Sequence, residues 1–344
     1  MDIVNQKIID AIIAKADKVC PGSLALIGIY GSVATGDAYG KSDLDLLLLI
    51  ENENGRKLGT GFILDDRKVG YDIYCTDWDG LRYDAECNHA HLSKLMDSQI
   101  VYIKNEEVSS KLLQLRAQAK QVLESETRFQ RAAQLAAKAK ICYANACLYE
   151  TLGEVRLEAF GVIHYLLDAI MLYHGKYFKR GVKRTFEELA MLPVDDLFKD
   201  TILKVAGSKE VPELRTFLKS LILYAEDHMR QEKTKAEPSE NLAGTYEEMY
   251  SNWRNKVEEA AEKDNLFASF MNLCNLQFML LHLSDQVEIG DFRILDEFSP
   301  DHLAENIRTV DAYLQKYEQI YEQAGIRVNR FADVDAFAES YLRE

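Results

Sequence analysis

The feature that most constrains this chain is an abrupt change in its hydrophobic pattern near Asn105. Before that residue, short apolar runs alternate with turn-forming segments, whereas after it nearly every segment repeats its apolar residues with the 3.6-residue period of a helix. The segments that read as strands are Leu24–Tyr30, Asp45–Ile50, Gly61–Leu64, Lys68–Cys75 and Ile100–Ile103. The pattern predicts an α+β protein, in which a small mixed β-sheet with flanking helices is followed by a large all-α helical bundle.

The length of 344 residues exceeds the usual size of one hydrophobic core, so we expect more than one domain. We predict a mixed domain over residues 1–105, a helical bundle over 106–235 and a C-terminal helical subdomain over 236–344. The second boundary falls in Arg230–Gly244, which is rich in charge, contains Pro238 and is predicted to form an exposed loop.

Charge limits the partners. The chain carries 41 Lys and Arg against 56 Asp and Glu, a net charge of -15, which argues against a polynucleotide-binding surface but allows a local basic pocket. The N-terminal residues do not resemble a signal peptide, and no run of about 18 apolar residues occurs, so we expect a soluble, cytoplasmic protein. The 6 cysteines form no C-x-x-C pair and are expected to be reduced.

The segment Ile29–Leu46 contains the residues with the clearest chemical potential. Gly31 allows a sharp turn, and Ser32 stands where a helix N-cap is expected, with free N–H groups after it that attract phosphate. Asp43 and Asp45 are two apart on an extended segment, so both carboxylates project to one face. Because two like charges so close are costly, we expect Mg²⁺ or Mn²⁺ between them.

A third carboxylate is expected from a neighbouring strand, and Asp72 is the candidate because the residues around it alternate as in a strand. Three carboxylates suit a two-metal site for in-line displacement at phosphorus. The alternative is that Asp43 and Asp45 form a solvated strand end.

Gly31-Ser32, then Asp43-x-Asp45 after ten intervening residues, then Asp72 on a later strand, resembles the signature of the DNA polymerase β type nucleotidyltransferase superfamily. The resemblance implies that residues 1–105 are the catalytic domain and that Gly31, Ser32 and Ser42 bind the nucleotide, with the two serines holding its β- and γ-phosphates. Asp43 and Asp45 would bind both metals, and Asp72 would bind one metal or the incoming hydroxyl.

The order of a catalytic domain followed by helices is similar to the kanamycin and lincosamide nucleotidyltransferases. In the former, a helix after the catalytic domain carries a Glu general base and, shortly afterwards, a phosphate-binding Lys. The stretch Tyr149–Arg156 resembles that helix and implies Glu150 as the base, but Glu154 stands where the Lys would be. A solvated helical Glu150 is the alternative. Because these enzymes often share their cleft across a dimer, a homodimer is expected by analogy.

A basic cluster between Lys176 and Arg184 stands out in so acidic a chain. We expect it either to contact the triphosphate or to be a solvated turn that complements helix carbonyls. Its members assigned to nucleotide binding are Lys176, Lys179, Arg180 and Lys183.

Two further patterns receive structural interpretations. His89 and His91 are predicted to be incidental loop histidines, because no other ligand at metal-binding spacing completes a set. A stripe at helical spacing is predicted to be core or a dimer face; it comprises Trp253, Phe267, Phe270, Met271, Phe278 and Met279.

The predicted function is metal-dependent transfer of a nucleoside monophosphate, AMP from ATP in the first instance, to a hydroxyl of a small acceptor such as an aminoglycoside-like antibiotic, with release of pyrophosphate. A cationic acceptor suits the acidic chain. One alternative is an AMPylating enzyme of toxin–antitoxin type, although Arg156 and His164 lie too far apart for the nuclease motif of the helical partners in those systems. The other is a nucleotide-binding regulator without turnover.

Overall fold

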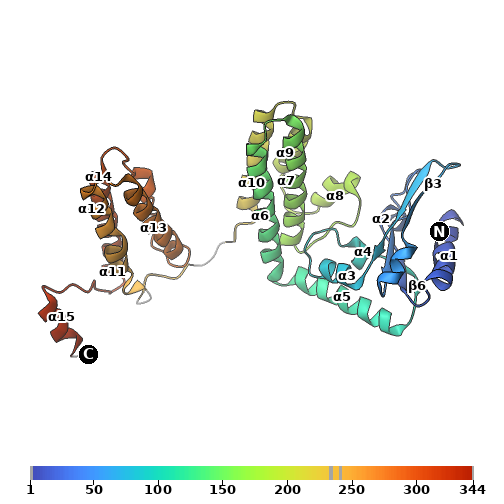
Figure 1. Cartoon of the computed structure of the whole chain (residues 1–344), viewed down its shortest axis with the longest axis horizontal. Coiled ribbons are helices and arrows are strands. Elements are labelled where there is room, and N and C mark those ends of the chain that lie inside the picture. The colour runs from blue at the N-terminus through green and yellow to red at the C-terminus, as the bar shows by residue number, and fades with distance from the viewer. Residues whose placement is uncertain (1–2, 232–234, 240–241, 343–344) are drawn as a thin grey trace. The chain divides into compact units, whose positions relative to one another are not determined.

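The computed structural model describes residues 3–231, 235–239 and 242–342, which form two compact units divided between residues 230 and 231 (Figure 1). The α+β class is confirmed, because all strands of the two described sheets lie before residue 105 and helices dominate thereafter. The finer division of the first unit at residue 105 stays a prediction. The loop expected at 230–244 includes residues 232–234 and 240–241, which lie outside the described residues.

The first unit contains a mixed four-stranded sheet of order β5-β2-β1-β6. The central strand β1 (Leu24–Ile29) is antiparallel to β2 (Leu46–Ile50) and to β6 (Gln99–Ile103), whereas β5 (Cys75–Thr76) runs parallel to β2. This mixed pairing was predicted from the strand-like segments.

Both faces of β2 are buried, which explains why this strand is continuously apolar rather than alternating. Leu47 and Leu49 join a core built mainly with the helices that follow the sheet. Leu48 and Ile50 join a second core with α1 (Ile3–Val19). Each such fully buried side chain stabilises the fold by roughly 1.5–3 kcal/mol.

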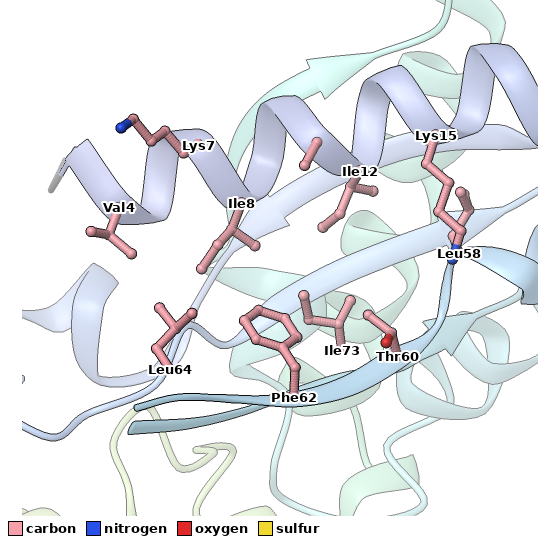
Figure 2. Close-up of a pocket in the computed structure, with 11 residues that line it drawn as sticks. Val4, Lys7, Ile8, Ile12, Lys15, Leu58, Thr60, Phe62, Leu64 and Ile73 are labelled. Atoms are coloured by element: carbon pink, nitrogen blue, oxygen red, sulfur yellow. The ribbon is translucent and has the colours of Figure 1, made fainter. Parts of the chain in front are cut away.

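A separate hairpin is formed by β3 (Thr60–Leu64) and β4 (Val69–Ile73). Alternation gives it two different faces. Phe62, Leu64 and Ile73 point toward α1 across an apolar hollow, which Figure 2 shows. Gly61 and Asp72 are paired in register and lie on the opposite face. Asp72 is thus on a strand, as predicted, but on the hairpin rather than on the four-stranded sheet.

Helices make up the rest of the first unit. They are η1 (Glu53–Leu58), α3 (Trp78–Ala85), α4 (Ser93–Met96), α5 (Glu106–Glu124), α6 (Thr127–Leu148), α7 (Leu152–Tyr173), η2 (Val182–Arg184), α8 (Thr185–Leu189), α9 (Asp196–Gly207) and α10 (Val211–His228). The long helices α6 and α7 lie side by side (Figure 1). They approach closely at Gly161, where a Cβ atom would be 2.7 Å from the Cys142 Sγ atom.

The second unit has its own apolar core. Its described elements are α11 (Thr245–Met249), the π-helical turn η4 (Tyr250–Arg254), α12 (Asn255–Glu262), α13 (Leu266–Ser284), η5 (Ile294–Glu297), α14 (Leu303–Gln323) and α15 (Val334–Tyr341). Trp253 and Met279 pack against this core, as predicted for the aromatic and methionine stripe.

The rest of that stripe is exposed, with Phe267 and Phe278 both 73% accessible and Phe270 and Met271 partly so. These side chains leave an uncovered apolar face on α13. The helix is also long and apolar enough to cross a membrane, which in a single helix is weak evidence because core helices of globular proteins share the property. The core interpretation of the stripe therefore holds for only part of it.

Candidate functional site

The turn after β1 is built around the carboxylate of Asp45. The Tyr30 N–H donates to the Asp45 carbonyl oxygen at 3.1 Å, which brings the two segments together. Gly31 has a φ of +66°, and a Cβ atom there would be 2.0 Å from Asp45 Oδ2. The position requires glycine, because any side chain would displace the carboxylate.

The short helix α2 (Gly31–Thr35) corrects the role expected of Ser32. Tyr30 occupies the N-cap position, so Ser32 lies inside the first turn. The backbone N–H of Ser32 donates to the Asp45 carboxylate. A carboxylate of the chain itself therefore takes a donor that the sequence pattern had reserved for phosphate.

Asp43 and Asp45 lie in the extended segment just before β2, with the buried Leu44 between them. Burial raises the pKa of Asp45, and the negative charge of Asp43 raises it further, against the hydrogen bond from Ser32. The two carboxylates therefore repel each other, as the spacing predicted. An all-oxygen donor pair in this state fits a hard divalent cation such as Mg²⁺ or Mn²⁺.

Asp72 shares a pocket with Asp43. The pocket has a volume of about 560 Å³ and is lined by both strands of the β3–β4 hairpin, with Gly61 and Gly70 in its wall. The two glycines carry no side chains, so the wall beside Asp72 is open to a ligand. Asp43 thus neighbours Asp45, whose pKa its charge raises, and lines one pocket with Asp72. The grouping of all three carboxylates as one site stays a prediction.

Ser42 closes a local turn. Its Oγ atom accepts a hydrogen bond from the Tyr39 N–H at 3.0 Å, and its own N–H donates to the Tyr39 carbonyl oxygen at 2.9 Å. The hydroxyl hydrogen is left for another acceptor. Contact of Ser42 with a phosphate stays a prediction.

The basic cluster docks on the loop between α2 and Asp43, through a residue that sequence reasoning missed. Lys183 donates to the backbone carbonyl of Asp37, and the Arg184 guanidinium contacts the Asp37 carboxylate at 3.0 Å. Arg180 approaches the same carboxylate at 3.6 Å. Although desolvation acts in the opposite direction, the hydrogen bond and charge of Arg184 lower the pKa of Asp37. The sequence contained a signal for this ion pair, because Asp37 directly follows Gly36 in the Ile29–Leu46 segment and basic side chains, which are its possible partners, are scarce.

The cluster also borders a second pocket, of about 620 Å³, beside Glu187 and Glu188. Lys176, Lys179 and Arg180 are among its lining residues. The buried Glu188 carboxylate accepts a hydrogen bond from the Lys179 backbone N–H at 3.0 Å and so fixes the path of the chain. The backbone of the cluster is therefore anchored at Lys179, while the side chains of Lys176, Lys179, Arg180 and Lys183 are exposed, and contact of these side chains with a triphosphate stays a prediction.

Glu150 does not lie on a helix. It occupies the exposed turn between α6 and α7, and the residue that departed from the expected pattern, Glu154, forms a capping box with Thr151 at the start of α7. This end of α7 is remote from the carboxylates. The helix has 22 residues and is about 33 Å long, and it is the segment after its other end that reaches the sheet.

The segment after α7 contacts the region of the sheet through Tyr177, whose hydroxyl donates to the Asp97 carboxylate at 3.0 Å. Two residues later, Gln99 pairs with Ile29, next to the Gly31 turn. The placement gives no support for Glu150 as a base at the carboxylates of its own chain, because a general base must come within hydrogen-bond reach of the proton it removes.

The interpretation of His91 as incidental was wrong. Its ring lies beside His164 and Asp168 of α7, and the ligand atoms of the three residues are within 4.8 Å of one another. His89 is engaged separately, at 3.0 Å from the Asp84 carboxylate. The spacing of His164 and Asp168, one helical turn apart, was visible in the sequence.

The apolar hollow between α1 and the hairpin has a volume of about 450 Å³ (Figure 2). Its lining is almost wholly apolar, with Lys7 and Lys15 as its charged members, and it includes no carboxylate. We do not assign the chemistry to it, because the acidic groups face the other side of the hairpin.

Comparison with known proteins supports this location. Residues 13–134 match the family model described as a nucleotidyltransferase domain, a span that includes Gly31, Ser32 and all three carboxylates. No curated protein sequence matches the chain. Among solved structures, the chain is similar to a nucleotidyltransferase-like protein from Exiguobacterium sibiricum 255-15, with 14% identity, a TM-score of 0.37, and coverage of 81% of this chain and 92% of that one. The matched domain is typical of transfer of a nucleoside monophosphate, a reaction that generally uses an NTP and a divalent metal.

Proposed function

We propose that this protein transfers a nucleoside monophosphate, AMP from ATP in the first instance, to a hydroxyl of a small acceptor and releases pyrophosphate. The observation that carries the proposal is that Asp43, the neighbour of Asp45, lines one pocket with Asp72 inside the matched domain. A pure nucleotide binder has no need of three carboxylates for a two-metal site.

The three carboxylates have two roles in this proposal. Asp43 and Asp45 hold the divalent cation, and the Ser32 N–H keeps Asp45 oriented. A bound Mg²⁺ would supply Lewis-acid stabilisation of the charge that develops at phosphorus. Asp72 is exposed on the hairpin and lines a pocket, and we assign it the role of taking the proton of an acceptor hydroxyl bound there.

The triphosphate is assigned to the side of the basic cluster. Lys176 and Lys179 are exposed at the second pocket, and Arg180 joins that pocket to Asp37. Cationic side chains placed there would balance the charge of the leaving pyrophosphate. Ser42 belongs to the same proposal, because its hydroxyl hydrogen remains available in the turn it closes.

The acceptor we propose is small and cationic, of the aminoglycoside type. The net charge of -15 attracts amines and repels nucleic acids, and the pocket beside Asp72 is of small-molecule size. We also propose that the enzyme is cytoplasmic and forms homodimers, because its sequence resembles the antibiotic nucleotidyltransferases.

The test is direct. The full-length protein is incubated with each NTP, Mg²⁺ and a panel of aminoglycosides, lincosamides and cell extract, and the products are analysed by mass spectrometry and for pyrophosphate. We expect a nucleoside monophosphate adduct on a small molecule. Adducts on protein alone would favour the AMPylating alternative, and nucleotide binding without pyrophosphate release would favour the regulator.

Two variants make the assignment specific. Asp72→Asn should lower turnover at least about a thousand-fold, or about 4 kcal/mol of transition-state stabilisation. Asp65→Asn, an exposed acid in the turn of the same hairpin, is the matched control and should retain full activity. Equal activity of the two variants would remove Asp72 from the mechanism.

A further inference from the structure

A second cluster of ligand-type side chains lies between α7 and the turn over residues 86–92. His91 comes from that turn, and His164 and Asp168 come from α7. The His91 Nε2 atom is 3.3 Å from Asp168 Oδ1, and the His164 Nε2 atom is 3.8 Å from Asp168 Oδ2. One helical turn separates His164 from Asp168, so both side chains leave α7 on the same face.

Asp168 is the unusual member of this cluster. It has no exposed surface, and neither carboxylate oxygen has a hydrogen-bond partner in the part of the chain that the structure describes. The Ala90 N–H is near enough to favour the charged form but does not satisfy either oxygen. A buried carboxylate without hydrogen bonds costs several kcal/mol, so a compensating group is expected.

Ring stacking also positions the two histidines. The His91 ring stacks between His164, at 5.5 Å, and Phe178, at 5.2 Å. His164 also stacks on Phe160 at 5.6 Å.

We propose that His91, His164 and Asp168 bind a divalent transition-metal ion of the Zn²⁺ type. Two imidazoles and one carboxylate are a usual donor set for such ions, and three protein ligands leave a fourth position for water. Ligands about 2.0–2.2 Å from a tetrahedral ion lie roughly 3.3–3.6 Å apart, and the 3.3 Å between His91 Nε2 and Asp168 Oδ1 matches this spacing. His164 Nε2 lies 3.8 Å from the other carboxylate oxygen, and one ligand atom from each residue falls within 4.8 Å of the others. His91 and His164 keep half and a third of their side-chain surface, so the open position faces solvent.

This site is distinct from the all-oxygen pair of Asp43 and Asp45, and the proposal does not depend on the proposed reaction. Its role in the fold follows from its neighbours. The Phe178 N–H donates to the Ala90 carbonyl oxygen at 2.8 Å, and Phe178 lies within the basic cluster. A metal bound by His91 therefore fastens the 86–92 turn to α7 and steadies the segment that carries the basic residues.

The experiment uses the full-length protein after removal of metals with a chelator. Co²⁺ is titrated in the presence of excess Mg²⁺, which keeps hard oxygen sites occupied, and the visible absorption of low-coordinate Co²⁺ is recorded. We expect one equivalent to bind. Since loss of even an outer-shell partner weakens metal affinity about 10- to 100-fold, His164→Gln and His91→Gln should each weaken it more than about 100-fold.

Control variants distinguish this site from metal binding elsewhere on the protein. His282→Gln, in the second unit, should leave the titration unchanged, because that ring contacts Gln286 at 3.1 Å and is not a member of the cluster. Asp43→Asn should also leave it unchanged, so that a failure of the proposed reaction does not affect the outcome. Circular dichroism establishes that each variant is folded, and Asp168→Asn tests the third ligand with little change of shape.

A second measurement is independent of colour. In the intact chain, Zn²⁺ should raise the Tm of the first unit in the wild type but not in His164→Gln, because a ligand that binds only the folded state stabilises that state. Absence of Co²⁺ binding, or binding that survives loss of His91 and His164 alike, would overturn the proposal and leave a metal-free histidine–aspartate network.

Discussion

Replacement of Gly31 by alanine offers a quantitative test of how the acidic site is built. The φ of +66° costs an L-residue roughly 1–2 kcal/mol. The added Cβ atom would also lie 2.0 Å from Asp45 Oδ2, so the carboxylate must leave its place. Loss of its hydrogen bond from the Ser32 N–H adds about 1.5–3 kcal/mol. We therefore expect Gly31→Ala to lower the free energy of unfolding of the first unit by about 2.5–5 kcal/mol.

Gly36 is a matched control at the other end of α2. Its φ is +75°, but a Cβ atom there would meet nothing within 4 Å. Gly36→Ala should therefore cost only the backbone contribution of about 1–2 kcal/mol. The difference between the two variants isolates the contact with Asp45.

The assay is urea unfolding followed by tryptophan fluorescence. The chain has 2 tryptophans, of which Trp78 lies in the first unit, so a Trp253→Phe background confines the signal to that unit. In an Asp45→Ala background, Gly31→Ala should cost nearly as little as Gly36→Ala, because the displaced carboxylate is gone. Equal costs of the two glycine variants in the wild-type background would refute the reasoning.

Three further predictions concern charge. Because the pKa of Asp45 is raised in the fold, its ionisation opposes folding as pH rises through that pKa. Without metal, the Asp45→Asn variant should therefore be more stable than wild type in urea titrations at neutral pH. Added Mg²⁺ should stabilise only the wild type. The pKa of Asp37 is lowered in the fold, so this carboxylate adds to the free energy of unfolding above its unfolded-state pKa, and the addition is lost as pH falls through its folded-state pKa. Arg184→Met should therefore flatten the acid side of the profile of stability against pH. An unchanged acid side would contradict the pairing of Arg184 with Asp37. Glu150→Gln should leave kcat within about twofold in steady-state assays, because Glu150 lies at the far end of α7; a large loss of kcat would require a second copy to supply it.

The carboxylate region could be predicted because its logic is local. Asp43 and Asp45 share a face of an extended segment whatever the rest of the chain does, and the glycine before them marks a tight turn. What the sequence could not show was the partner of the Ser32 N–H. That partner is a carboxylate brought back by the β1–β2 pairing, and a local pattern does not distinguish it from a phosphate.

Two other outcomes separate local signals from tertiary ones. The start of α7 was readable, because Thr151 and Glu154 form the T-x-x-E pattern of a capping box, which places Glu150 outside the helix. The cluster of His91 with His164 was only half readable. Its two members on α7 are close in the sequence, but His91 comes from a turn more than 70 residues before His164, and only the tertiary fold brings them together.

The β3–β4 hairpin is a single layer that separates an apolar hollow from a pocket lined by carboxylates. On one side Phe62 and Ile73 border the hollow beneath α1, and on the other side Asp72 borders the acidic pocket. Asp72 and Ile73 are adjacent on β4, so the packing of apolar side chains under α1 affects the position of the Asp72 carboxylate. The position of Asp72 would then be adjustable from the reverse side of the hairpin, for example by enlarging Ala11, without altering any acidic residue.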